Sequence, residues 1–312
     1  MRIHLDTDLG SDTDDACALA MLLGWPDVEV TGITTTIDPG GIRAGMVARC
    51  LELAGRTDIP VAAGADVSLT TRTTPGTIPT DARYWPEPVE PRPSRMGDAM
   101  VLLRESVESG ATIVAIGPYT NLARLEAIMS GSLGRVPVVL MGGIVRPAAA
   151  GLPRWGPEMD WNVQCDTNAA QVVFANTTDL TVVTVPTTFK AHLRAAHLPR
   201  LRAAGPLGEL LARQAEAHAA DNSMTDLGHA HDALPDDLLN FQYDAVACAV
   251  AAGWSGAVTE EIGLAPVLEE KVLRFEPDAR GRATNVVVDI DAADFEERWF
   301  AAVECGARAV MR

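Results

Sequence analysis

Basic residues are scarce in this chain, where 25 Lys and Arg stand against 42 Asp and Glu and give a formal net charge of −17. A surface of that sign repels phosphate backbones and anionic lipid head groups, which disfavours nucleic acid and membrane surfaces as partners. No apolar run approaches the ~20 residues of a membrane-spanning helix. A neutral or cationic small molecule is therefore the expected partner.

Cysteine is also sparse, with five residues, an odd count and no C-x-x-C spacing. Most of them lie in apolar, helix-like surroundings, so we expect reduced packing residues and not a disulfide framework. The amino terminus runs directly into a strand pattern, without the features of a signal peptide. These observations together predict a cytoplasmic location.

No internal repeat and no Gly- or Ser-rich linker interrupts the 312 residues, so one domain covering 1–312 is expected. Strand-like and helix-like patterns alternate through the first two thirds, which favours an α/β fold with a mostly parallel central sheet and helices on both faces. The expected strands are Ile3–Leu5, Val28–Thr36, Pro60–Ala63, Ala111–Ile116, Val136–Met141, Leu180–Val185 and Ala283–Ile290. The expected helices are Ile42–Ala54, Tyr119–Ile128, Thr167–Asn176, Leu207–Ala220 and Asp291–Val310. Two long segments, 68–95 and 221–240, read as lids or binding loops.

The densest chemical signal is an acidic run directly after the first strand, and it contains Asp6, Asp8, Asp12, Asp14 and Asp15. Carboxylates gathered at the carboxyl end of a strand repel one another unless a cation lies among them. Hard divalent cations prefer this all-oxygen environment, and Ca²⁺ accepts more oxygen ligands than Mg²⁺ does. The run therefore predicts a metal site at a strand-to-helix turn.

Helix capping is the competing explanation for part of this run. Ser11 or Asp12 could cap the following helix, and acidic residues suit the first helical turn. Capping does not account for Asp6 and Asp8, which lie at the end of the strand pattern.

Several separated motifs, in order along the chain, resemble the inosine–uridine-preferring nucleoside hydrolase family. They are D-x-D-x-G with a following D-D-A, GPYTNLA at 117–123, VVLMGG at 138–143, DWN at 160–162 with Asp166, and YDAVACAVA at 243–251. The resemblance extends from Asp6 to about Val250. It implies a Rossmann-like core and hydrolysis of the N-glycosidic bond of a ribonucleoside to ribose and free base. It also implies a homo-oligomer, either a dimer or a tetramer.

The resemblance also implies roles for individual residues. Ca²⁺ would be held by Asp8, Asp15, Asp244 and the main-chain carbonyl of Leu140, and Asp8 would also activate the attacking water. The sugar would be bound by Asp14, with Asp160 and Asn162 at its far end. Trp161, Trp155 and Trp85 are candidates to stack on a base, although core packing would explain them equally well.

The chain also departs from the family pattern in several places. Asp12 is an additional acid, because GSDTDD replaces G-x-D-D, and it is expected to act as a ligand or as a helix cap. The asparagine after the second strand is absent, since 37–41 reads IDPGG. Asp160 replaces Glu. Tyr243 stands where many members have the histidine that protonates the leaving base, so Tyr243, His229, His231 and Tyr84 are the candidate acids, with Tyr243 and His231 preferred.

Three functions remain open from the sequence. The first is the Ca²⁺-dependent ribonucleoside hydrolase. The second is a hydrolase of a modified nucleoside or another glycoside, which the additional Asp12 and the lost asparagine favour. The third is a non-catalytic, metal-dependent binder of a nucleoside or sugar, which the loss of the histidine favours. A phosphohydrolase is disfavoured, because no P-loop or basic phosphate clamp accompanies the acidic turn.

Overall fold

The computed structural model describes residues 1–10, 12–70 and 77–310. Ser11, one of the two candidate caps, and residues 71–76 of the expected binding loop lie outside this described part of the chain. None of the described helices is long and apolar enough to cross a membrane.

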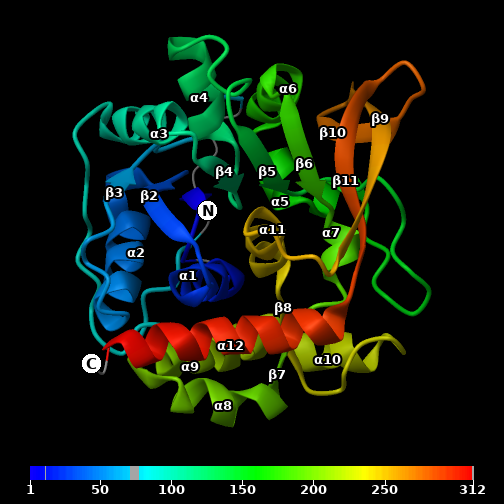
Figure 1. The fold of residues 1–312 in the computed structure, drawn as a ribbon. Coiled ribbons are helices and arrows are strands. Elements are labelled where there is room, and N and C mark those ends of the chain that lie inside the picture. Colours follow the sequence, from blue (N-terminus) through cyan, green and yellow to red (C-terminus); the bar gives the residue numbers. More distant parts are fainter. Residues whose placement is uncertain (11, 71–76, 311–312) are drawn as a thin grey trace.

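The described residues form a nine-stranded central sheet with the order β10-β9-β11-β6-β5-β4-β1-β2-β3 (Figure 1). Its strands are β1 (Arg2–Thr7), β2 (Glu29–Thr35), β3 (Val61–Ala63), β4 (Thr112–Ala115), β5 (Pro137–Met141), β6 (Asp179–Val183), β9 (Ala257–Glu269), β10 (Val272–Pro277) and β11 (Arg282–Ile290). Every neighbouring pair from β3 to β11 is parallel, and only β9 pairs antiparallel with its neighbours. The expected mostly parallel sheet is confirmed.

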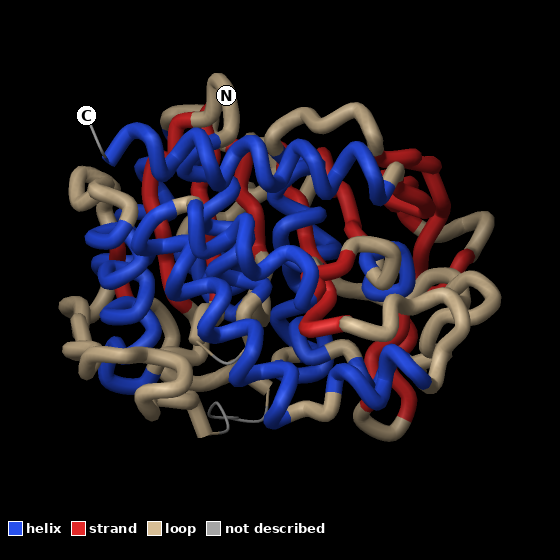
Figure 2. Tube along the Cα trace, turned by 90° about the horizontal axis from the view of Figure 1, so that it is seen from below, coloured by secondary structure: helices blue, strands red, loops and turns tan. Residues whose placement is uncertain are grey.

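Helices cover both faces of this sheet, as Figures 1 and 2 show. They are α1 (Asp14–Gly24), α2 (Ile42–Leu53), α3 (Asp98–Glu108), α4 (Thr120–Ile128), α5 (Trp161–Cys165), α6 (Thr167–Asn176), α7 (Val185–Thr188), α8 (Leu198–Ala203), α9 (Gly205–Asp221), α10 (Met224–His229), α11 (Tyr243–Ala251) and α12 (Ala292–Val310). A second small sheet pairs β7 (His192–Arg194) antiparallel with β8 (Leu238–Phe241).

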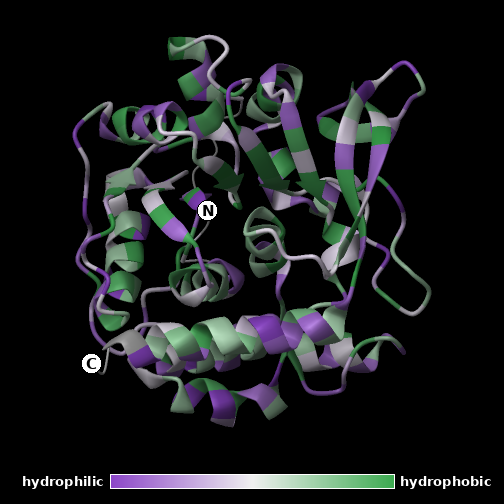
Figure 3. Ribbon diagram, viewed as in Figure 1, coloured by the Kyte–Doolittle hydropathy of each residue, from purple (hydrophilic) through white to green (hydrophobic). Residues whose placement is uncertain are grey.

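The apolar side chains separate into two cores, one on each face of the sheet. Along β5, Val138 and Leu140 enter the core beneath α3, α4 and α6, whereas Val139 and Met141 enter the core beneath α1, α2 and α11. Successive side chains of a strand point to opposite faces, so a strand that is covered on both sides must be apolar throughout. This explains continuous apolar runs such as that of β5, which Figure 3 shows mainly in green.

The structure corrects the sequence reading in two places. The segment 221–240, which we expected to be a loop, contains α10 and most of β8. The antiparallel β9–β10 hairpin was not expected, because many of its side chains are exposed and their sequence lacks a clean alternation of apolar and polar residues.

The order of the strands places one set of loops together. The neighbouring strands β1, β4 and β5 run parallel, so their carboxyl ends and the turns that follow lie at one edge of the sheet. Ligands of open α/β sheets bind at this edge. The helix α11 packs against both α1 and β5, and it brings a distant part of the chain to the same place.

Candidate active site

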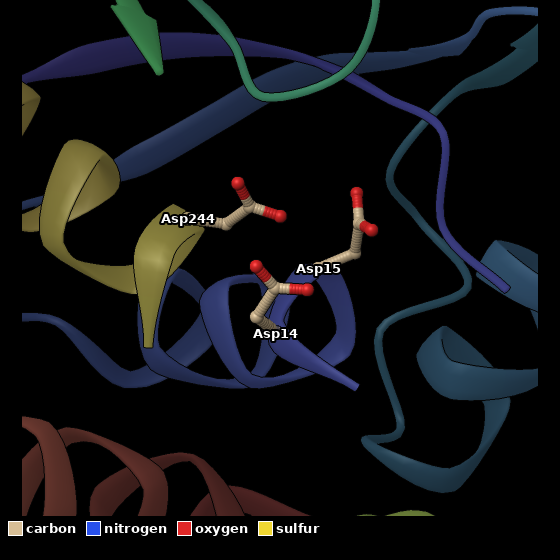
Figure 4. A group of neighbouring side chains, drawn as sticks. All are labelled: Asp14, Asp15 and Asp244. Carbon is tan, nitrogen blue, oxygen red and sulfur yellow. The ribbon is translucent and has the colours of Figure 1, made fainter. Parts of the chain in front are cut away.

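Three carboxylates from two helices meet at this edge of the sheet. Asp14 and Asp15 open α1, and Asp244 lies in the first turn of α11. Each offers an oxygen that lies within 4.8 Å of the oxygens offered by the other two, and all three residues are buried. Figure 4 shows the three side chains pointing toward one another.

The turn from β1 into α1 holds the side chain of Asp15 in place. The Thr7 hydroxyl, at the end of β1, donates to the Asp15 carboxylate and accepts from the Leu9 N–H at 3.1 Å. Gly10 then takes φ +126°, and a Cβ at this position would lie 2.5 Å from the Met46 sulfur. Glycine is thus required for both its backbone conformation and its lack of a side chain.

Burial and mutual repulsion raise the pKa values of the clustered carboxyls. For Asp14, Asp15 and Asp244 the pKa lies well above its usual range, first because burial disfavours the charged form and second because the neighbouring carboxylates repel it. A divalent cation would remove both penalties. The donors are all hard oxygens on rigid helix starts, so the residues present form an acidic site that fits such an ion.

Asp8 lies beside this cluster and has two partners of its own. Its Oδ2 accepts from Trp161 Nε1 at 3.1 Å and lies 3.8 Å from the Arg43 guanidinium. Burial raises the pKa of Asp8, and the Arg43 charge opposes that rise. The charge of Asp8 in turn raises the pKa values of Asp14, Asp15 and Asp244, which places Asp8 in the same electrostatic unit.

Arg43 is a residue of this site that sequence reasoning missed. It is fully buried on α2, and it also donates to the carbonyl oxygens of Ile37 at 3.1 Å and Leu9 at 3.2 Å. It thereby ties the IDPGG turn to the acidic turn. A charged residue inside the otherwise apolar face of Ile42–Leu53 was the available signal, because a buried arginine needs a carboxylate partner.

A cavity of about 690 Å³ opens onto the acidic cluster. Its walls come from both halves of the chain: Asp8, Asp12, Asp14, Asp15, Thr77, Ile116, Met141, Trp155, Met159, Asp160, Trp161, Asn162, Val185, His218, Asn222, Met224, Leu227, Asn240, Tyr243 and Asp244. The volume suits a small molecule, and the mixture of apolar rings with convergent carboxylates is typical of an enzyme site.

A family model described as inosine-uridine preferring nucleoside hydrolase matches residues 3–297. The chain belongs to this family. It is therefore a nucleoside hydrolase, an enzyme that cleaves N-glycosidic bonds.

Known relatives agree with this assignment. The pyrimidine-specific ribonucleoside hydrolase RihA of Salmonella agona is 32% identical over 224 residues, which cover 68% of this chain and 69% of the relative. A purine-preferring ribonucleoside hydrolase from Gardnerella vaginalis superposes with a TM-score of 0.79 at 21% identity, covering 99% of this chain and 100% of that one. A plant nucleoside hydrolase also superposes with a TM-score of 0.79, at 22% identity, covering 97% of this chain and 98% of that one. The two structural likenesses show the shared fold.

Two predicted sugar-binding residues of the nucleoside hydrolase line the cavity, and both are held by the backbone. Asp160 caps α5 by accepting from the Val163 N–H at 3.2 Å, and it also accepts from the Gly143 N–H. Burial raises its pKa to about 6. Asn162 donates through Nδ2 to the carbonyl oxygens of Ile116 at 2.9 Å and Met141 at 3.0 Å.

Leu140, the fourth predicted metal ligand, does not share the position of the three predicted aspartate ligands, which line the cavity. It lies within β5, its side chain enters the core beneath α3, α4 and α6, and it is not among the described residues that line the cavity. The adjacent Met141 and the neighbouring-strand Ile116 do line it. A role for the Leu140 carbonyl stays a prediction.

The aromatic candidates divide between cavity and core. Trp161 and Trp155 line the cavity, whereas Trp85 and Tyr84 are buried in the core around α1 and α2. Tyr84 donates to Asp221 at 3.1 Å. Tyr243 lines the cavity, and burial together with the surrounding carboxylates raises its pKa well above the usual value. A phenol in that state donates hydrogen bonds but releases its proton reluctantly.

The candidate histidines of the 221–240 segment lie away from the described cavity walls. His229 is exposed at the end of α10, and His231 is half-buried, with Nδ1 3.0 Å from the Leu227 carbonyl oxygen. The histidine that does line the cavity is His218, near the end of α9. Sequence reasoning placed His218 inside an ordinary helix, where only the fold reveals what it faces.

Proposed function

We propose that this enzyme hydrolyses ribonucleosides to ribose and free base with Ca²⁺ as its resident ion. The observation that carries the proposal is the buried set Asp14, Asp15 and Asp244 at the end of a cavity large enough for a nucleoside. Ca²⁺ suits a crowded set of carboxylate ligands, whereas Mg²⁺ usually keeps several waters and fewer protein ligands. The matching relatives described as ribonucleoside hydrolases support the choice of sugar.

In this proposal Asp8, Asp15 and Asp244 would hold the ion together with a main-chain carbonyl, which we assign to Leu140. When bound, the ion neutralises the carboxylates and makes a coordinated water more acidic. Asp8, whose pKa is raised by burial, is placed to accept the proton of the attacking water. The Trp161 N–H and the Arg43 guanidinium keep its carboxylate in position.

The remaining polar residues orient the sugar. Asp14 accepts hydrogen bonds from the ribose hydroxyls, and Asp160 and Asn162, at the start of α5, contact the far end of the sugar. Cleavage of the N-glycosidic bond develops positive charge on the sugar ring, as in other glycoside hydrolyses. The cluster of carboxylates is fixed before the reaction begins, so it stabilises that charge without reorganising.

The proposal also includes a single domain over 1–312, a homo-oligomeric assembly and a cytoplasmic location. The first is supported by the absence of linkers, and the second by the family resemblance. The third is supported by the five cysteines, which are all free.

The role of Asp14 predicts discrimination between sugars. A 2′-deoxyribonucleoside lacks a hydroxyl that a buried carboxylate would accept from, and it leaves that acceptor desolvated and unpaired. We expect kcat/KM for uridine or inosine to exceed that for its 2′-deoxy counterpart by roughly 10²-fold or more. Initial-rate measurements of sugar release from matched pairs check this. Equal rates for ribo and deoxy substrates would contradict the assignment of Asp14.

A further inference from the structure

The α9–α10 wall of the cavity carries a polar group that the proposed chemistry has not used. We define this wall by its lining residues His218, Asn222, Met224 and Leu227. Met224 and Leu227 are apolar and suit contact with the face or edge of a flat base. His218 is the single titratable group among these four, and only 7% of its surface is exposed.

His218 is held from one side of its ring. Its Nδ1 lies 3.6 Å from Asp12 Oδ1 and 3.3 Å from Asn222 Nδ2, and Asn222 is itself held by donating from Nδ2 to the His218 carbonyl oxygen at 3.0 Å. The other ring nitrogen, Nε2, has no hydrogen-bond partner among the described residues, and it is not one of their solvent-excluded polar atoms. Nε2 is therefore available to a ligand of the cavity that His218 lines, whereas Nδ1 lies beside the carboxylate.

Asp12 is itself fixed in place. Asn240, at the end of β8 and 2% exposed, uses its Oδ1 to accept from the Phe241 N–H at 2.8 Å. Its Nδ2 is thereby turned toward Asp12 and donates to Oδ1. Asp12 is the additional acid of the GSDTDD run, so this chain of contacts, Asn240 to Asp12 to His218, depends on the residue that departs from the family pattern.

We propose that His218 is the general acid that protonates the departing base and that Asp12 is the residue that positions it. The inference rests on the proposed function. The Asp12 carboxylate beside Nδ1 holds the orientation of the ring, as in other carboxylate–histidine pairs. Tyr243 stands in the family's histidine position. His218 supplies what that position has lost.

The step balances as a hydrolysis. The bond between the anomeric carbon and the base nitrogen breaks, and its electron pair stays with the base. The proton on His218 Nε2 moves to a basic atom of the base, which leaves neutral. Water forms the new bond to the anomeric carbon and gives one proton to Asp8. Solvent removes that proton and reprotonates His218, so the net reaction is nucleoside plus water to ribose plus base.

A substrate with a good leaving group separates acid catalysis from every other role. p-Nitrophenol leaves as a stable anion, so p-nitrophenyl β-D-ribofuranoside needs the same water and sugar contacts but no proton donor. With Ca²⁺ present, we expect His218→Gln to lower kcat on inosine and uridine by about 10²–10³-fold. On the nitrophenyl riboside the same variant should stay within a few-fold of the wild type.

Two further variants keep the test sharp. Asp12→Asn should also lower kcat on the nucleosides but not on the nitrophenyl riboside, by a smaller factor of about tenfold. Because the Asp12 side chain is only part-buried, this variant still tests the inference if His218→Gln folds poorly. His197→Gln is the matched control, because His197 is similarly buried, at 9% exposed, and does not line the cavity. It should leave both rates unchanged.

The other outcomes overturn the inference in distinguishable ways. If His218→Gln and Asp12→Asn lower kcat equally on the nucleosides and on the nitrophenyl riboside, or lower it on neither, His218 is not the acid, although the hydrolase activity itself stands. A selective loss in His231→Gln instead would assign the acid to His231. Failure of the wild-type enzyme to cleave any of these substrates would remove the proposed function, and the inference with it.

Discussion

The Asp244→Asn enzyme is expected to lose its bound Ca²⁺ and to fall by about 10³-fold or more in kcat/KM on nucleosides, the scale reached when a group that stabilises the transition state is removed. Asp244 lies in the first turn of α11, and its carboxylate meets Asp14 and Asp15 in the buried cluster. An amide keeps the shape of the side chain but removes the charge that holds a cation.

The same substitution should stabilise the metal-free protein, which separates a site residue from a structural one. In the metal-free protein burial, and after it the repulsion of the surrounding carboxylates, raises the pKa of Asp244, so the fold holds an unfavourable acidic group there. Removing the charge of Asp244 relieves this repulsion and should raise the thermal stability of the metal-free protein, whereas removing a structural carboxylate would lower it. Metal content, turnover and thermal unfolding after chelation check the three effects, with exposed Asp179→Asn as control. Full metal content and activity in Asp244→Asn would contradict the assignment of this residue.

Chelated protein is expected to lose stability as the pH rises from 5 to 8. Burial raises the pKa of Asp6 to about 7 and that of Asp160 to about 6, both from the usual 3.8. Between 3.8 and these raised values the folded state holds protons that the unfolded state has released, so the stability that the two carboxyls contribute is lost as the pH rises through 6 and 7. The buried His4, whose pKa burial lowers from 6.5 to about 3, acts in the opposite direction below about pH 6.5, so the clearest fall is expected above that pH. Each group contributes a slope of about 1.4 kcal/mol per pH unit in its window.

Ca²⁺ should reverse part of this trend. The cluster carboxylates must be ionised to bind a cation, so affinity and the stabilisation that binding provides both increase with pH. Thermal unfolding at pH 5, 6, 7 and 8, each with chelator and with excess Ca²⁺, measures both effects. We expect a midpoint in chelator that falls by several degrees, and a gap between the two curves that widens with pH. A chelated midpoint that rises with pH would contradict the raised pKa values.

Local patterns in the sequence predicted most of the parallel sheet and the acidic part of the site. The strands β4, β5 and β6 lie in short, mainly apolar runs because helices cover both faces, and such runs can be recognised without a structure. Asp8, Asp14 and Asp15 lie close together in the sequence. The prediction that they lie in one site therefore needed only the strand end that precedes them.

The other side of the cavity could not be predicted, because its residues come together only through the fold. His218 is one histidine inside α9, and its meaning depends on Asp12, which is 206 positions away by their numbering. Arg43 likewise acquires its role only when α2 packs beside the acidic turn. The β9–β10 hairpin was missed because exposed strands carry a weak hydrophobic pattern.

The most direct test of the account is to measure ribose release from inosine and uridine by metal-free enzyme as Ca²⁺ is titrated back. The account predicts no release after chelation and release that rises with Ca²⁺ to saturate near one ion per chain. Full release after exhaustive removal of the metal would contradict it. Tight binding of one Ca²⁺ and of nucleoside without any release would contradict it as well, and would favour a non-catalytic binder.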